Sequence, residues 1–230
     1  MRFDIHYRPA HALAIAKLAA GEHVRAESGA MVSMSSNIEV QTDGPMGRAG
    51  GGLWKKLKRA VLSGETFFTN HYLARGGPGE VTLAPSLCGD MVVHELSRGE
   101  DLLIQGSSYM AAPDTVDIDT QFQGFRGLFS GENLFFLRAT GQGPVLMNAF
   151  GAIETVDLSG ELIVDTGHLV ALTSGLHYEI GTATSGWIAS FLSGEGLVLR
   201  VRGQGRLYLQ TRNPTEYGRH VGRLLPPREQ

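Results

Sequence analysis

A cluster of basic side chains near residue 55 could bind an anionic partner. We call the five residues Trp54, Lys55, Lys56, Lys58 and Arg59 the basic cluster, in which four basic side chains follow a Trp. Leu53, Leu57 and Val61 recur every four residues, so the sequence predicts a short inserted helix near 53–62 with one apolar face. Basic charge beside an interfacial Trp is the chemistry that contacts an anionic membrane surface or an acidic protein. The alternative is that the apolar face packs on the body and the lysines stay in water.

Electrostatics limit what this basic cluster can do alone. Its four basic residues supply about 4 kcal/mol near an anionic membrane, which corresponds to about millimolar affinity. Membrane association would therefore need several copies of the cluster on one face of an oligomer.

Three carboxylates recur in equivalent sequence contexts. The triplet Ser-Gly-Glu recurs at 63–65, 130–132 and 193–195, and its acids there are Glu65, Glu132 and Glu195. If these acids meet near a common axis, they could bind a cation or raise one another's pKa. We favour the alternative that each carboxylate accepts backbone hydrogen bonds at its own turn, because an acid after Ser-Gly is typical of turns.

The remaining reactive residues show no catalytic arrangement. Cys88 is the only cysteine, which excludes an internal disulfide and suits a structural thiol in a reducing compartment. The chain has no Gly-x-Ser-x-Gly elbow and no phosphate-binding loop. The eight histidines lack the H-x-H, H-x-x-x-H and H-E-x-x-H spacings of metal sites: His6, His11, His23, His71, His94, His168, His177 and His220. We therefore expect no catalytic residue, no cofactor and no metal.

Composition places the chain among ordered globular proteins. It has 230 residues, 42% hydrophobic and 19% charged, with a formal net charge of −3. The negative charge, and the lack of strands that interleave basic and aromatic residues, argue against a nucleic-acid partner. No stretch approaches the roughly 18 continuous apolar residues of a membrane span, so we expect a cytoplasmic protein that is at most peripheral to a membrane.

Internal repetition organises the chain. The three copies of Ser-Gly-Glu at 63–65, 130–132 and 193–195 each precede an apolar run and then a Gly-x-Gly: "GPGEV", "GQGPV" and "GQGRL". The repetition divides the sequence into a first unit (1–85), a second unit (86–150), a third unit (151–213) and a tail (214–230). Only the first unit carries the basic stretch, as an insertion over 43–62. A segment that two units omit is typical of an appended contact element.

Within each unit the sequence alternates like a half-buried strand. "IEVQT", "VDIDT" and "RLYLQT" place apolar residues at every second position. The sequence therefore predicts an all-β fold with near sixteen strands and pseudo-threefold symmetry. Each Gly-x-Gly precedes another such run, so we interpret it as a hairpin turn and not as part of a dinucleotide-binding fingerprint.

Five motifs in order carry a resemblance to a known family. They are "GGLWKKLKRAVLSGETFF", "APSLCGDM", "FSGENLFFLRATGQGPV", "VDTGHLVAL" and "LSGEGLVLRVRGQGRLYLQTR". Together they resemble the altered-inheritance-of-mitochondria family, whose eukaryotic founders are associated with mitochondrial biogenesis and whose bacterial members have no defined biochemical role. The resemblance implies repeated TRAP-like domains, short relatives of the double-stranded β-helix, and a ring-like or trimeric homo-oligomer. It brings no catalytic residue.

Two functional hypotheses follow. The first is a non-enzymatic β-repeat scaffold or binding protein, a homo-oligomer with a trimer favoured, that contacts an anionic membrane surface or an acidic protein through its basic segment. The alternative is a β-fold with a pocket between repeats that binds a small molecule or a metal, which could be an enzyme.

Overall fold

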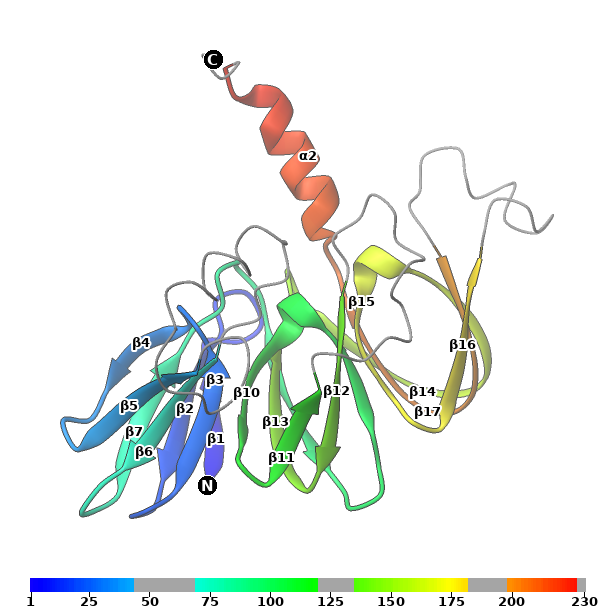
Figure 1. Ribbon diagram of the computed structural model, residues 1–230. Helices are drawn as coiled ribbons and strands as arrows, with labels where there is room; N and C mark the ends of the chain where they lie inside the picture. Colours follow the sequence, from blue (N-terminus) through cyan, green and yellow to red (C-terminus); the bar gives the residue numbers. More distant parts are fainter. Residues whose placement is uncertain (44–68, 120–134, 182–197, 227–230) are drawn as a thin grey trace.

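The computed structural model describes residues 1–43, 69–119, 135–181 and 198–226 (Figure 1). Strands dominate this part of the chain, which confirms the all-β class predicted from the alternating runs. The helix predicted near 53–62 lies outside the described residues.

Strands follow one another along the chain with short connections. The first unit contains β1 (Arg2–His6), β2 (Leu13–Leu18), β3 (His23–Glu27), β4 (Met31–Met34), β5 (Ile38–Asp43), β6 (Thr69–Ala74) and β7 (Gly79–Leu83). The second contains β8 (Met91–Leu96), β9 (Leu102–Gln105), the 3-10 turn η1 (Gly106–Ser108), β10 (Tyr109–Pro113), β11 (Val116–Asp119), β12 (Phe136–Gly141) and β13 (Gly143–Asn148). The third contains β14 (Ile153–Asp165), η3 (Thr166–His168), β15 (Leu169–Thr173), β16 (Leu176–Gly181) and β17 (Val198–Gln210), before helix α2 (Pro214–Leu224).

The strands form three antiparallel sheets. Their orders are β1-β2-β7-β4, then β5-β6-β3-β10-β13-β8, then β11-β12-β9-β15-β17-β14, with β16 also pairing with β17. The first sheet belongs wholly to the first unit, whereas the second and third sheets each combine strands from two neighbouring units. In Figure 1 the units lie side by side in chain order, from blue through green to orange.

A pairing pattern recurs along the chain. In the second unit β13 pairs with β8 and β10, while β12 pairs with β9 and β11. In the first unit β7 pairs in the same way with β2 and β4, and β6 pairs with β3 and β5. In the third unit the long strand β17 pairs with β14 along its whole length, and with β15 and β16.

Direct strand pairing joins each unit to the next. Ala111 of β10 lies opposite Ala26 of β3, and Ala171 of β15 lies opposite Ile104 of β9. All four side chains are fully buried. The hydrophobic core therefore continues across both junctions, as contiguous clusters that mix residues of adjacent units.

The Gly-x-Gly motifs form corners, so the hairpin prediction is wrong. β12 and β13 follow one another through Gly141 and Gly143 but belong to different sheets. Gly141 has φ +113°, and a Cβ there would lie 2.3 Å from the carbonyl oxygen of Thr115. Gly203 in the middle of β17 has φ +124° and the same close approach to Gly175. Gly141 is required because the chain changes sheets there while another turn packs against its backbone, and Gly203 meets the same packing although β17 stays in one sheet.

Helix α2 is an element that the sequence analysis missed in the tail. Asn213 caps its N-terminus by accepting hydrogen bonds from the amides of Thr215 and Glu216, at 2.9 and 3.3 Å, and Pro214 opens the first turn. None of its residues is buried, and Figure 1 shows it projecting from the β body. No helix in the described ranges is long and apolar enough to cross a membrane.

A polar clamp fastens the loop after β1 to the second unit. Arg8 donates two hydrogen bonds to Asp90, at 2.7 Å from Nε and 2.9 Å from Nη2. The side chain of Asp90 is only 4% exposed, and it also accepts a hydrogen bond from the Met91 amide. The bond to Asp90 raises the pKa of Arg8, so the guanidinium stays charged.

Removing Arg8 should therefore destabilise the fold. Arg8→Met leaves the buried carboxylate of Asp90 without its cation, and we expect it to lower the free energy of unfolding by about 2 kcal/mol. Arg2→Met is the matched control, because the Arg2 side chain is 70% exposed and its loss should cost less than about 0.5 kcal/mol. Urea unfolding measures both, and equal effects would contradict the clamp.

Candidate functional site

Both binding sites predicted from the sequence lie outside the described part of the chain. The basic cluster (Trp54, Lys55, Lys56, Lys58 and Arg59) and the three recurring acids (Glu65, Glu132 and Glu195) lie outside the described residues. The strands on either side of these segments are described, and each pair is antiparallel: Asp43 lies opposite Thr69, and Gly181 lies opposite Val198.

An open groove of about 420 Å³ lies between the second and third units. The turn after β8 forms one wall, and strands β14, β15 and β17 form the other. Its lining combines basic, acidic and hydroxyl side chains: His94, Glu100, Asp157, Leu158, Ser159, Thr173, Gln204, Gly205 and Arg206. The groove is the described feature that most resembles a binding site, because convergent polar groups line a concave surface.

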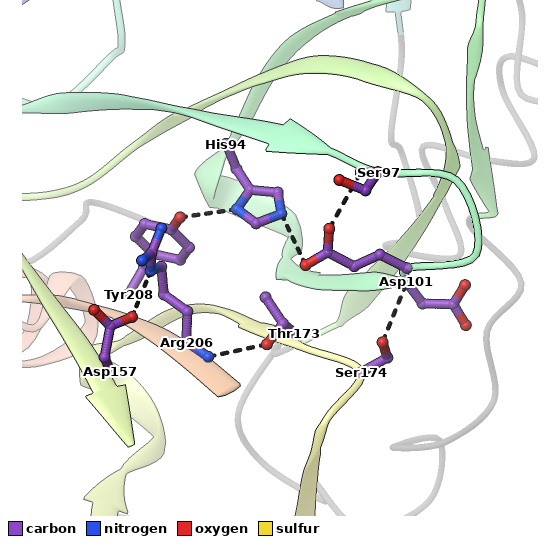
Figure 2. A network of polar contacts seen from close by, with 9 residues as sticks. His94, Ser97, Asp101, Asp157, Thr173, Ser174, Arg206 and Tyr208 are labelled. Atoms are coloured by element: carbon purple, nitrogen blue, oxygen red, sulfur yellow. Dashed lines mark hydrogen bonds and ion pairs between the residues drawn. The ribbon is translucent and has the colours of Figure 1, made fainter. Parts of the chain in front are cut away.

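A buried histidine lies at the centre of this lining (Figure 2). His94 points inward from β8 and its side chain is 7% exposed. Its Nδ1 lies 2.8 Å from the hydroxyl of Tyr208 on β17, and the two rings meet edge to face with centroids 5.8 Å apart. On the other side, Nε2 lies 3.3 Å from Oε1 of Glu100. The imidazole thus links strands of two units.

The charge states follow from these surroundings. Burial lowers the pKa of His94, and the neighbouring carboxylate of Glu100 offsets only part of that effect. The imidazole is therefore neutral at pH 7. A carboxylate can only accept, so Nε2 carries the proton and Nδ1 accepts the hydroxyl of Tyr208. Burial also raises the pKa of Tyr208, which keeps that hydroxyl protonated.

An ion pair forms the exposed rim of the groove. Arg206 donates from Nε to Oδ1 of Asp157 at 2.7 Å, across the β14–β17 pairing. That hydrogen bond raises the pKa of Arg206 and lowers the pKa of Asp157. The backbone amide of Arg206 also donates to the hydroxyl of Thr173 at 3.0 Å. Both charged side chains remain accessible, at 47% and 74% exposure.

This arrangement can bind more readily than it can catalyse. Tyr208, His94 and Glu100 form a chain along which a proton could move from a phenol to a carboxylate. The phenol, however, is only 2% exposed, so a substrate in the groove would not reach it. The exposed polar groups of the lining are the guanidinium of Arg206, the carboxylate of Asp157, and the side chains of Ser159 and Gln204. In the described ranges, no three His, Cys, Asp or Glu side chains gather as ligands for a metal ion.

Sequence spacing could not have identified this network. His94 appeared among eight histidines without a diagnostic spacing, and its partner Tyr208 lies 114 residues away. Only the proximity of Glu100, six residues after His94 and across a tight turn, left a local signal.

A half-buried carboxyl with a raised pKa lies outside the groove. Glu27 ends β3, and burial raises its pKa from 4.5 to about 7. The folded protein therefore holds a proton that the unfolded chain releases above pH 4.5. The contribution of Glu27 to stability is greatest below pH 4.5 and is lost as the pH rises towards 7.

Glu27→Gln should remove this pH dependence. Relative to the unmodified protein, we expect the variant to gain stability progressively between pH 4.5 and 7, by roughly 2–3 kcal/mol in total. Denaturant unfolding at several pH values measures the difference. Glu95→Gln, at an exposed position on β8, is the control and should show no such trend. A constant difference for Glu27→Gln would contradict the assignment.

Tyr208→Phe tests the histidine network. The substitution keeps the ring but leaves Nδ1 of His94 buried without a donor, which should cost about 1–3 kcal/mol of stability. Thermal or urea unfolding measures the loss. Tyr217→Phe removes the same hydroxyl from a ring that is 50% exposed, and it should change stability by less than about 0.5 kcal/mol. Similar effects of both variants would show that the hydroxyl of Tyr208 does not hold His94.

Comparison with known proteins agrees with this fold. An uncharacterized protein of Streptococcus pyogenes serotype M6 is 30% identical to the chain over 232 residues, covering 98% of this chain and 92% of that protein. A crystal structure of a Streptococcus pyogenes protein from structural genomics has a TM-score of 0.77 and 28% identity, covering 97% of this chain and 99% of that one. The family model described as Mitochondrial biogenesis AIM24 matches residues 3–212. The chain therefore belongs to the mitochondrial biogenesis AIM24 family.

Proposed function

We propose that the protein is a non-enzymatic β-repeat scaffold that binds an anionic membrane surface through basic amphipathic segments. The observation that carries the proposal is helix α2, which projects from the body with an uncovered apolar face. Tyr217, Leu224 and Leu225 are 50%, 73% and 63% exposed.

Physical chemistry explains why α2 suits a partner. A helix of 11 residues is marginal in water unless one face packs against something. The ring of Tyr217 contacts Phe150 of the body, with centroids 5.1 Å apart, and this contact lies in the first turn. Beyond it, Arg219 pairs with Glu216 of the same helix, and Arg223 adds positive charge in the last turn. An apolar face with basic flanks is the composition of helices that lie on anionic membranes.

The inserted stretch 43–62 shares this chemistry in its sequence. It contains four basic residues within five positions beside Trp54. Neither segment supplies enough free energy for stable attachment by itself, at about 1 kcal/mol per basic residue. The proposal therefore includes several copies of the chain on one surface, a homo-oligomer such as a trimer, so that weak contacts add.

The scaffold itself we propose to be three TRAP-like units related by pseudo-threefold symmetry. The recurrence of one pairing pattern in residues 1–85, 86–150 and 151–213 supports this assignment, as do the equivalent glycine corners at Gly141 and Gly203. A rigid row of units would hold appended segments in fixed relative positions.

Co-sedimentation with vesicles tests the membrane proposal. Vesicles with and without anionic lipid, at low and at physiological salt, are mixed with the full chain. We expect salt-sensitive binding to anionic vesicles only. Lys55/Lys56/Lys58/Arg59→Glu and Arg219/Arg223→Glu should each weaken that binding by at least about tenfold.

The matched control reverses two exposed arginines elsewhere. Arg2/Arg98→Glu changes the net charge as much as Arg219/Arg223→Glu does, so it should bind like the unmodified protein if position matters and not total charge. Unchanged binding of both test variants would contradict the proposal. Loss of an acidic protein partner, with no effect on vesicles, would assign the segments to protein recognition instead.

A second candidate function is binding of a polar small molecule in the groove. The accessible Arg206 and Asp157 beside the groove favour it. Native mass spectrometry of the purified protein would show a bound molecule, and Arg206→Gln should release it. A protein without added mass would count against this candidate.

A further inference from the structure

The junctions between units follow one rule. Strands β4, β10 and β15 are equivalent in the three units. Each contains one extra, unpaired residue at the same point of its pairing with β7, β13 or β17. At the two internal junctions this counterpart strand pairs with the preceding unit: β10 with β3, and β15 with β9. Each internal junction therefore pairs the equivalent of β4 in one unit with the equivalent of β3 in the preceding unit.

Each end of the row of units has one strand edge of this kind without a neighbouring unit, among the described strands. Among the described strands, β4 pairs only with β7, and it has no preceding unit to join. At the other end, residues 161–165 of β14 correspond to β3 and β9, yet β14 pairs only with β17 among the described strands. Figure 1 shows β4 at one extreme of the row and β14 in the unit at the other.

Apolar side chains at these two free edges are more exposed than their equivalents at the internal junctions. Where β15 meets β9, Leu172 and Leu103 lie opposite each other and are 2% and 7% exposed. Their counterparts at the free ends are Met34 and Ile163, which are 41% and 39% exposed. Val32 of β4 is 57% exposed, although the counterpart positions on β10 and β15 are fully buried.

We propose that a second copy of this chain covers these edges, with β4 of one copy pairing antiparallel with residues 161–165 of the next. Transfer of the internal register places Ser33 opposite Val164 and Met34 opposite Ile163. The pairing would continue the backbone hydrogen bonding from chain to chain and bury the exposed side chains of Val32, Met34 and Ile163. Such a contact is heterologous, so it closes into a ring or extends into a filament.

The inference deepens the proposed scaffold function, because it names the surface through which copies would assemble. Its support is independent of the basic segments, and its test does not involve a membrane. Oligomers that ignore vesicles would overturn the membrane proposal alone. Vesicle-binding oligomers whose mass does not respond to charges at Met34 and Ile163 would overturn this inference alone.

Light scattering after size exclusion, applied to charge variants of the full chain, tests the pairing. We expect the unmodified protein at about 100 µM to exceed the chain mass of 24.8 kDa by a factor of two or more. The double variant Met34→Lys/Ile163→Lys would place two positive charges opposite each other at every contact between copies. We therefore expect this variant to be monomeric. In Met34→Lys/Ile163→Glu each heterologous contact would oppose a cation and an anion, and we expect the oligomer to return.

The charge-swapped variant also excludes a symmetric contact. If each edge paired with its own copy, Met34→Lys/Ile163→Glu would oppose Lys with Lys and Glu with Glu, and it would stay monomeric. Val40→Lys is the control for a new charge at a 38% exposed apolar position elsewhere, and it should keep the native mass. Circular dichroism verifies that each variant is folded. A monomeric unmodified protein, or an oligomer that survives the two lysines, would overturn the inference.

Discussion

Strand pairing between neighbouring units is the interaction on which the rest of this structure depends. Two short ladders, centred on Ala26 with Ala111 and on Ile104 with Ala171, merge strands of separate units into common sheets. Small or branched side chains at these four positions are fully buried, so the sheets approach closely and the core runs through both junctions. A unit removed from the row would expose the apolar side chains that its neighbour now covers.

The polar groove is a consequence of the second junction. Because β15 pairs with β9, the turn that carries Glu100 lies near the start of the turn after Thr173, where Ser174 donates its amide to the carbonyl of Asp101 at 2.9 Å. The same junction brings His94 to Tyr208, although they are far apart in sequence. Its polar groups thus serve first to connect two units, and the exposed polar side chains of its lining are Asp157, Ser159, Gln204 and Arg206.

Much of the architecture was predictable from the sequence, and the site was not. Alternating runs such as "VDIDT" predicted strands, because side chains on a half-buried sheet must alternate. The motif Gly-x-Gly was misinterpreted, because glycine serves a hairpin and a sheet-changing corner equally well, and only the approach of Thr115 to Gly141 separates them. Helix α2 was missed although Asn213 and Pro214 are a start signal. The histidine network depends on tertiary contacts that leave no periodic trace.

A framework extended by edge pairing suits a protein that presents contact segments rather than one that encloses a substrate. Its central claim is that the pairing rule of the internal junctions also operates at the free edges, β4 and residues 161–165. Hydrogen exchange of the native protein tests this claim most directly. The account predicts that amides at these two edges are protected as strongly as those of β10 and β15, and that protection at the edges alone is lost on dilution to monomer. Edge amides that exchange rapidly at every concentration, beside protected internal junctions, would contradict it.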